Sequence, residues 1–182
     1  MTRNHVNHFR LLALSGSLRA ASFNTAALHA LAQLAPDNVN VLISGLGDIP
    51  LFNPDLENSA PSSVIALKEK LRACDGLIIA SPEYAHGMTG VLKNALDWLV
   101  SGDEFVDKPI MLINTSPRAT HAQASLKEVL ITMSGKLIEN AQVTIPLLGS
   151  QLDCQGIVAH VDISQQLKTS LNELCEAITQ LK

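Results

Sequence analysis

In Leu11-Leu-Ala-Leu-Ser-Gly-Ser-Leu-Arg-Ala-Ala-Ser-Phe-Asn24, a short apolar run gives way to a loop of small hydroxyl residues and then to a helical pattern. This order predicts a strand, a tight loop and the start of a helix. Helix N-termini carry free backbone N–H groups and a partial positive charge, and both favour a bound phosphate. The candidate phosphate ligands are the polar side chains of the loop, Ser17, Arg19, Ser22 and Asn24.

This loop has neither the G-x-G-x-x-G spacing of dinucleotide-binding folds nor the lysine of a Walker nucleotide site. It therefore resembles neither a nicotinamide-binding fingerprint nor a nucleotide triphosphatase. A simpler alternative is that Ser22 and Asn24 only cap the helix and that Arg19 is an exposed loop residue. Capping and phosphate binding are also compatible at one position.

Strand-like and helix-like segments alternate along the chain outside this loop. Strands are predicted over residues 9–15, 39–44, 76–80, 109–114 and 137–145, and helices over residues 23–34, 61–74, 89–100, 119–134 and 163–181. This alternation predicts an α/β three-layer sandwich with a five-stranded parallel sheet between two layers of helices. Right-handed crossovers and the common open arrangement give the strand order 2-1-3-4-5, with a ligand site outside the carboxyl ends of the first and third strands.

Length and composition fit one globular domain. The chain has 182 residues, of which 47% are hydrophobic, so we expect a single domain over residues 9–182 and a loose tail over residues 1–8. The net charge of −4 argues against binding to nucleic acid or to an anionic membrane. No apolar run approaches the roughly 18 residues of a membrane span, and residues 9–14 are too short for a signal-peptide core.

The nucleophilic and metal-binding residue types show no recognisable site. Cys74, Cys154 and Cys175 are odd in number and lack C-x-x-C spacing, which argues against a disulfide framework and favours a cytoplasmic location. The histidines have no zinc-site spacing, so no metal is expected. No G-x-S-x-G motif is present, which argues against a serine hydrolase.

A second loop, over residues 81–90, follows the third predicted strand and should face the phosphate loop across the cleft. Pro82 restricts the backbone there, and Gly87 and Gly90 permit close approach to a flat ligand. Tyr84 offers an aromatic edge and His86 a polar tip. A planar heterocycle could lie against this loop and bind its backbone N–H and C=O groups.

The two loops together resemble the NADPH-dependent FMN reductases, a family of flavodoxin-like flavoenzymes that includes bacterial chromate and quinone reductases and some azoreductases. The family signatures are G-S-[LV]-R-x-x-S-x-N and P-E-Y-x-x-x-x-x-G-x-L-K-N-A-[IL]-D-W, which stand here at residues 16–24 and 82–98. Residues 49–57, with the sequence Ile-Pro-Leu-Phe-Asn-Pro-Asp-Leu-Glu, also resemble the family's second loop. The resemblance covers about residues 11–134 and implies a flavodoxin-like fold.

The resemblance also implies non-covalently bound FMN. The phosphate ligands would be Ser17, Arg19, Ser22 and Asn24, with backbone N–H groups from Leu18 and Phe23. The residues bordering the isoalloxazine would be Pro82, Glu83, Tyr84 and Ala85, with His86 and Gly87 close by. Ser116, after the fourth strand, would meet the ring from the other side.

By the same resemblance, NADPH would deliver a hydride to FMN and leave, and a small acceptor would then take its place in a ping-pong order. Acceptors in the family are quinones, azo compounds, chromate or free flavin. Because the chemistry belongs to the cofactor, no catalytic protein acid or base is expected. The family also implies a homodimer or homotetramer. Two alternatives remain open, namely a flavodoxin-type electron carrier and a binding module that has lost its flavin.

The chain departs from the family pattern near the expected ring site. Many members have Asn where this chain has Ala85, Ser where it has Gly87, and Pro where it has Thr89. In the loop after the fourth strand, His121 and Gln123 replace a glycine-rich run. Acceptor preference could therefore differ at this loop.

Overall fold

A computed structural model describes residues 7–181 and has a parallel β-sheet at its centre. Its strands are β1 (Phe9–Ser15), β2 (Val39–Ser44), β3 (Gly76–Ala80), β4 (Pro109–Asn114), β5 (Lys136–Leu137) and β6 (Val143–Thr144). The strand order is β2-β1-β3-β4-β5, and β6 also pairs with β4. The predicted fold class and strand order are confirmed.

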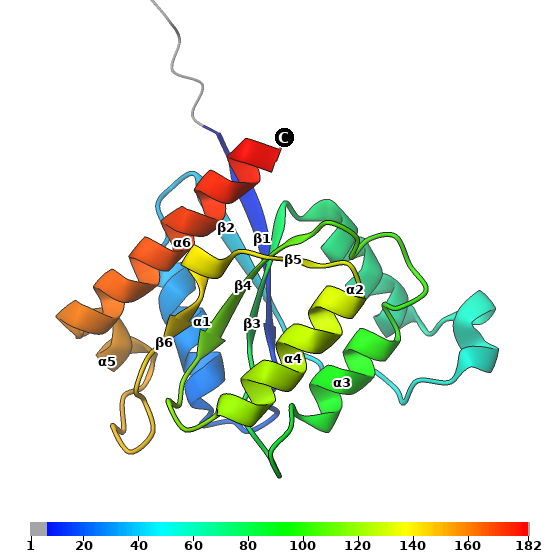
Figure 1. Ribbon diagram of the computed structural model, residues 1–182, viewed down its shortest axis with the longest axis horizontal. Coiled ribbons are helices and arrows are strands. Elements are labelled where there is room, and N and C mark those ends of the chain that lie inside the picture. The colour runs from blue at the N-terminus through cyan, green and yellow to red at the C-terminus, as the bar shows by residue number, and fades with distance from the viewer. Residues whose placement is uncertain (1–6, 182) are drawn as a thin grey trace, which may run out of the picture.

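Helices cover both faces of this sheet. The α-helices are α1 (Phe23–Leu34), α2 (Ser62–Ala73), α3 (Gly90–Asp97), α4 (Thr120–Thr132), α5 (Cys154–Ala159) and α6 (Val161–Leu181), and the 3₁₀ helices are η1 (Pro54–Ser59) and η2 (Glu139–Ala141). One layer contains α1, α5 and α6, and the other contains α2, α3 and α4 (Figure 1). The two helical layers and the sheet form the predicted three-layer sandwich.

The central strands supply side chains to both layers of the core. In β1, Leu11 and Ala13 pack toward α1 and α6, whereas Leu12 and Leu14 pack toward α2 and α3. Every residue of β3 and β4 is buried. Burial on both faces explains why these strands are continuous apolar runs instead of alternating ones.

The prediction of a single strand over residues 137–145 is wrong. Two short strands, β5 and β6, occupy this region and both pair with β4, because the turn η2 interrupts the chain between them. Ala141 in this turn is fully buried beside the α6 layer of the core. The polar sequence Glu139-Asn140 fits a turn better than the interior of a strand.

The helix α5 was not predicted. Asp153 caps it, because the Asp153 carboxylate oxygen Oδ1 accepts a hydrogen bond from the Gly156 N–H at 2.8 Å. Helix α6 begins at Val161, two residues before the predicted start. Residues 1–6 of the predicted loose tail lie outside the described residues, and the single-domain organisation stays a prediction. Among residues 7–181, no helix has the length and apolarity that crossing a membrane requires.

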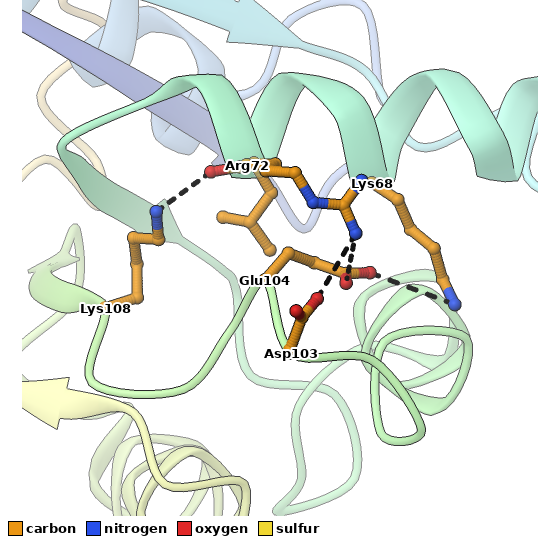
Figure 2. Close-up of polar contacts among 6 residues, drawn as sticks. Lys68, Arg72, Asp103, Glu104 and Lys108 are labelled. Atoms are coloured by element: carbon orange, nitrogen blue, oxygen red, sulfur yellow. Dashed lines mark hydrogen bonds and ion pairs between the residues drawn. The ribbon is translucent and has the colours of Figure 1, made fainter.

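A buried carboxylate fixes α2 to the loop that leads into β4 (Figure 2). The side chain of Glu104 is 1% exposed, and its oxygen Oε2 lies 3.2 Å from Arg72 Nη2. Lys68 Nζ lies 3.8 Å from the other carboxylate oxygen. Lys108 Nζ donates to the backbone carbonyls of Leu71 and Cys74 at 3.0 and 2.7 Å. The Lys108 bonds satisfy carbonyl groups at the end of α2, and the Glu104 contacts join that helix to the loop between α3 and β4.

Candidate functional site

The loops after β1 and β3 approach each other closely at the carboxyl edge of the sheet. The Gly16 N–H donates to the Ala80 carbonyl at 2.8 Å, and a Cβ atom at Gly16 would lie 2.3 Å from Ser81 Oγ. Thr89 Oγ1 donates to the Gly16 carbonyl at 2.7 Å. Thr89, which is a departure from the family pattern, therefore ties the start of α3 to the β1 loop, a bond that proline could not make.

The hydroxyl-rich loop leads into α1 as predicted. Ser22 is the N-cap residue, and its Oγ accepts from the Thr25 N–H at 3.3 Å. The Ser17 Oγ accepts from the Arg19 N–H at 3.3 Å. Among residues 7–181, Arg19 has no carboxylate partner for its guanidinium. The loop thus presents an uncompensated positive charge beside the N-terminus of α1.

Asn24 is buried and joins α1 to the end of β4. Its side-chain oxygen Oδ1 lies 3.1 Å from Thr115 Oγ1, a hydroxyl that can donate to it. With the oxygen engaged, the amide N–H groups are the atoms that Asn24 can offer to a ligand. Thr115 was not predicted as a site residue, although it stands directly after the fourth predicted strand, where the topology places ligand contacts.

A cavity of about 360 Å³ lies between the loops that follow β1, β3 and β4. The predicted residues that line it are Ser17, Arg19, Ser22, Phe23, Asn24, Pro82, Glu83, Tyr84 and Ser116. It is also lined by Ala21, Ser81, Asn114, Thr115, Arg118, Ala119 and Leu148, which were not predicted as site residues. The predicted residues Leu18, Ala85, His86 and Gly87 are not in its lining. Leu148 follows β6, and as an apolar side chain it carried no signal of ligand binding in the sequence.

The residues of the second loop that lie outside this lining form a tight turn. Tyr84 and Gly87 exchange two backbone hydrogen bonds of 3.0 Å each, and the two residues between them have left-handed backbone conformations. The φ angles are 49° at Ala85 and 60° at His86. Both central residues of the turn have positive φ, a conformation that favours glycine or asparagine. The alanine that replaces the family's asparagine therefore sits in a strained conformation.

We expect Ala85→Gly to raise the free energy of unfolding by about 0.5–1 kcal/mol, because glycine adopts positive φ without steric conflict. Chemical denaturation of the flavin-free protein measures this change. The matched control is Ala124→Gly on an exposed helical position of α4, which should lower stability by about 1 kcal/mol. Equal destabilisation by the two substitutions would contradict the strain at Ala85.

Glu83 connects the second loop to the N-terminus of α4. Its oxygen Oε2 accepts from the Ala122 N–H at 2.8 Å, and its oxygen Oε1 lies 3.3 Å from His86 Nδ1. The rings of His86 and His121 meet edge to face, with centroids 4.5 Å apart. The hydrogen bond from Ala122 is the main cause that holds the pKa of Glu83 below its usual range. Because α4 lacks a side-chain cap of its own, Glu83 takes that role from the neighbouring loop.

The lowered pKa of Glu83 predicts an acid-sensitive contribution to stability. This contribution is complete above the pKa that the side chain has in the unfolded chain, and it is lost as the pH falls through the lower pKa of the folded state. We therefore expect Glu83→Gln to lower the Tm at neutral pH, and the difference from the parent protein to shrink below about pH 4. Thermal unfolding of flavin-free protein from pH 7 to pH 3 measures it. A difference that stays constant with pH would contradict the cap.

Trp98 lies inside the chain rather than on a surface free for a second subunit. It is 1% exposed, its Nε1 donates to the Pro50 carbonyl at 2.8 Å, and its ring meets Phe52 edge to face. The Asn94 side chain holds the same loop, with Oδ1 accepting from the Phe52 N–H at 2.8 Å. Asn94 and Trp98 of the second signature therefore fix the loop at residues 49–57 through side-chain hydrogen bonds.

Comparisons with known proteins agree with this geometry. Residues 9–148 match the family described as NADPH-dependent FMN reductase. The chain is 34% identical to an NAD(P)H-dependent FMN reductase of Pseudomonas aeruginosa, over 81% of this chain and 83% of that protein. It is 31% identical to a quinone reductase of Escherichia coli K12, over 95% and 97% of the two chains.

A solved structure extends the similarity to the fold. The flavoenzyme FerB, an NAD(P)H:(acceptor) oxidoreductase of Paracoccus denitrificans, superposes with a TM-score of 0.78 at 27% identity, over 94% of this chain and 98% of FerB. The family match covers most of the chain, including the loops after β1, β3 and β4 that line the cavity. The chain thus belongs to the NADPH-dependent FMN reductase family of oxidoreductases, which use FMN with NAD(P)H as the electron donor.

Proposed function

We propose that this protein transfers a hydride from NADPH through bound FMN to a small acceptor, in a ping-pong order. The observation that carries the proposal is the cavity at the carboxyl ends of β1, β3 and β4, where Arg19 lies beside α1 and has no carboxylate partner among residues 7–181. The acceptor class that we favour is a quinone. Two relatives that align with 90% and 95% of this chain are named 2-hydroxy-1,4-benzoquinone reductase and quinone reductase. Azo compounds, chromate and free flavin remain further candidates.

The chain's groups fit the phosphate of FMN. The first turn of α1 presents free backbone N–H groups, and Ser22 holds that turn in place by capping it. Arg19 supplies a positive charge, and Ser17 supplies a hydroxyl at the same rim of the cavity. Asn24 adds amide N–H donors from within the cavity. Together these groups would bind a dianion without help from a metal ion.

The remaining lining fits a planar ring. Pro82, Glu83 and Tyr84 border one side of the cavity, and Ser116 lies on the loop after β4. When bound, FMN would carry two electrons from donor to acceptor. The protein's part would be to bind FMN and orient its ring. Backbone N–H groups near the pyrimidine edge would favour the charge that gathers there on reduction. The Glu83 cap on α4 holds the ring-side loop in position.

We expect Arg19→Ala to weaken FMN binding by about 10-fold to 100-fold, because a charge-assisted hydrogen bond contributes roughly 1.5–3 kcal/mol. Riboflavin lacks the phosphate, so its affinity should change less than about twofold. Flavin fluorescence titration of the apoprotein measures both ligands. An equal loss for FMN and riboflavin would show that the substitution perturbs the whole cavity and would contradict the phosphate role.

The experiment that tests the function is an absorbance spectrum of protein loaded with FMN and then mixed anaerobically with NADPH. Bleaching of the flavin bands, followed by their return when a quinone is added, is the expected result. Flavin that is retained but not reduced by NADPH would instead favour an electron carrier. Protein that retains no flavin and fails to oxidise NADPH in the presence of free FMN would favour a binding module.

We also propose a cytoplasmic location and a homodimer or homotetramer, as the resemblance implies. Three cysteines without disulfide spacing support the first. Exposed apolar side chains support the second, because Leu51 is 84% and Val100 63% exposed in the single chain. Light scattering of the purified protein tests the oligomeric state.

A further inference from the structure

A second cavity, of about 450 Å³, adjoins the flavin cavity at the phosphate loop. It lies between the first two turns of α1 and the segment at residues 151–154 that leads into α5. Both cavities are lined by Arg19, Ala21, Ser22 and Phe23. The second cavity therefore begins where the phosphate end of a bound flavin would lie.

The walls of this second cavity are held in place by contacts between α1 and α5. Gln33 on α1 donates from Nε2 to Cys154 Sγ at 3.4 Å, and Gln155 Nε2 donates to Gln33 Oε1 at 3.1 Å. Among the lining residues, Ala26 and Leu152 pack on the core and offer apolar surface. A cavity with fixed apolar walls and a few polar groups is typical of a small-molecule subsite.

The polar lining fits a nucleoside joined to phosphate. Arg19 borders both cavities and has no carboxylate partner in the described part of the chain, so it can face a diphosphate that spans them. At the other end, Gln151, Asp153 and His29 present hydrogen-bonding side chains. Asp153 uses Oδ1 to cap α5, which leaves its other carboxylate oxygen as an acceptor for an exocyclic amine.

We propose that this cavity is an adenylate subsite, so that the protein binds FAD as well as FMN. The flavin ring and first phosphate would occupy the first cavity, and the second phosphate and adenosine would extend past Arg19 into the second. This inference rests on the proposed function, because it takes the position of the first phosphate from it. The adenosine half of NADPH is a weaker candidate, because the second cavity adjoins the phosphate loop and shares none of the ring-side residues Pro82, Glu83 and Tyr84.

The test compares FAD with FMN in variants that alter only the second cavity. Ala26→Leu fills part of its volume, and His29→Glu puts a negative charge in place of one of the polar groups that would meet the adenosine. Neither residue lines the flavin cavity. The matched control is His8→Glu, an exposed position before the amino end of β1, at the opposite edge of the sheet.

Titration of apoprotein by flavin fluorescence should give an FAD dissociation constant at least about threefold lower than that of FMN. Each second-cavity variant should raise the FAD constant about tenfold or more, with the FMN constant within about twofold of the parent value and no change in the control. Two results would overturn the subsite while leaving the proposed function intact. One is FAD binding that the variants do not affect, and the other is an effect of the variants on the KM for NADPH alone. Failure to bind either flavin would instead overturn the proposed function, and the subsite with it.

Discussion

Replacing Arg72 with alanine will lower the free energy of unfolding by about 3 kcal/mol, because it leaves a buried carboxylate without its nearest positive charge. Glu104 is 1% exposed, and Arg72 Nη2 is 3.2 Å from its oxygen Oε2. Within residues 7–181, Lys68 is the other cation near this carboxylate, 3.8 Å from Oε1, and no hydrogen bond reaches that oxygen. Lys68 compensates part of the Glu104 charge. The expected loss therefore lies at the lower end of the roughly 3–5 kcal/mol that breaking a buried ion pair costs. Urea denaturation of the flavin-free protein measures the change.

A neighbouring residue provides an internal control for this prediction. Arg72 Nη2 also lies 3.2 Å from Asp103 Oδ1, but the Asp103 side chain is 89% exposed. Replacing Asp103 with alanine should therefore lower the free energy of unfolding by less than about 1 kcal/mol. If desolvation of Glu104 is the cause, Arg72→Ala should also have little effect in a Glu104→Leu background, because no buried charge is left behind. If Arg72→Ala still lowers the free energy of unfolding by about 3 kcal/mol in that background, Arg72 acts by packing alone.

The sequence predicted most of the fold because its strongest signals are local. Residues 76–80 and 109–114 are apolar at every or nearly every position, and such runs bounded by polar residues identify buried parallel strands. The predictions failed where tertiary contacts decide the structure. The turn η2 forms where Ala141 enters the core, and α5 is only six residues long, too short for a helical period to stand out.

Part of the candidate site could also be predicted, because topology determines which loops meet at the carboxyl edge of the sheet. Side chains that follow β1 and β3 are placed by topology, so Ser17, Ser22 and Pro82 could be assigned to one cavity from their position in the chain. The contacts of Glu83 with Ala122 and of Thr89 with Gly16 join segments distant in sequence, and no local pattern reveals them. The strain at Ala85 could not be predicted from the sequence either. The replacement of asparagine by alanine is visible in the sequence, but only the backbone φ angle shows that this residue has a left-handed conformation.

Replacing Gly16 with alanine will raise the FMN dissociation constant at least about 100-fold, if the flavin binds where we propose, and will lower stability by about 1–3 kcal/mol. The new Cβ would lie 2.3 Å from Ser81 Oγ, 2.7 Å from Ser81 Cβ and 3.1 Å from its Cα. Carbon atoms in contact are normally about 3.5–4.0 Å apart, so the loops after β1 and β3 must separate. Ser81 is 3% exposed and has little room to move.

A second substitution distinguishes this steric mechanism from a general loss of structure. Ser81→Gly removes the two closest atoms, so the double variant with Gly16→Ala should recover most of the FMN affinity and stability. Gly90→Ala is the matched control, because Gly90 does not line the flavin cavity and a Cβ there meets no described atom within 4 Å. It should bind FMN as the parent protein does and gain slightly in stability, since alanine is the better helix former at the start of α3.

The predicted effect of Gly16→Ala follows from the position of this glycine between the sheet and the ligand loops. Its N–H continues the β1–β3 ladder by bonding Ala80, and its carbonyl accepts from Thr89 at the start of α3. A shift at Gly16 therefore moves the phosphate loop and the ring-side loop together, which neither Arg19→Ala nor Ala85→Gly can do. Loss of FMN affinity without loss of riboflavin affinity in Gly16→Ala would contradict this coupling, because it would confine the damage to the phosphate end.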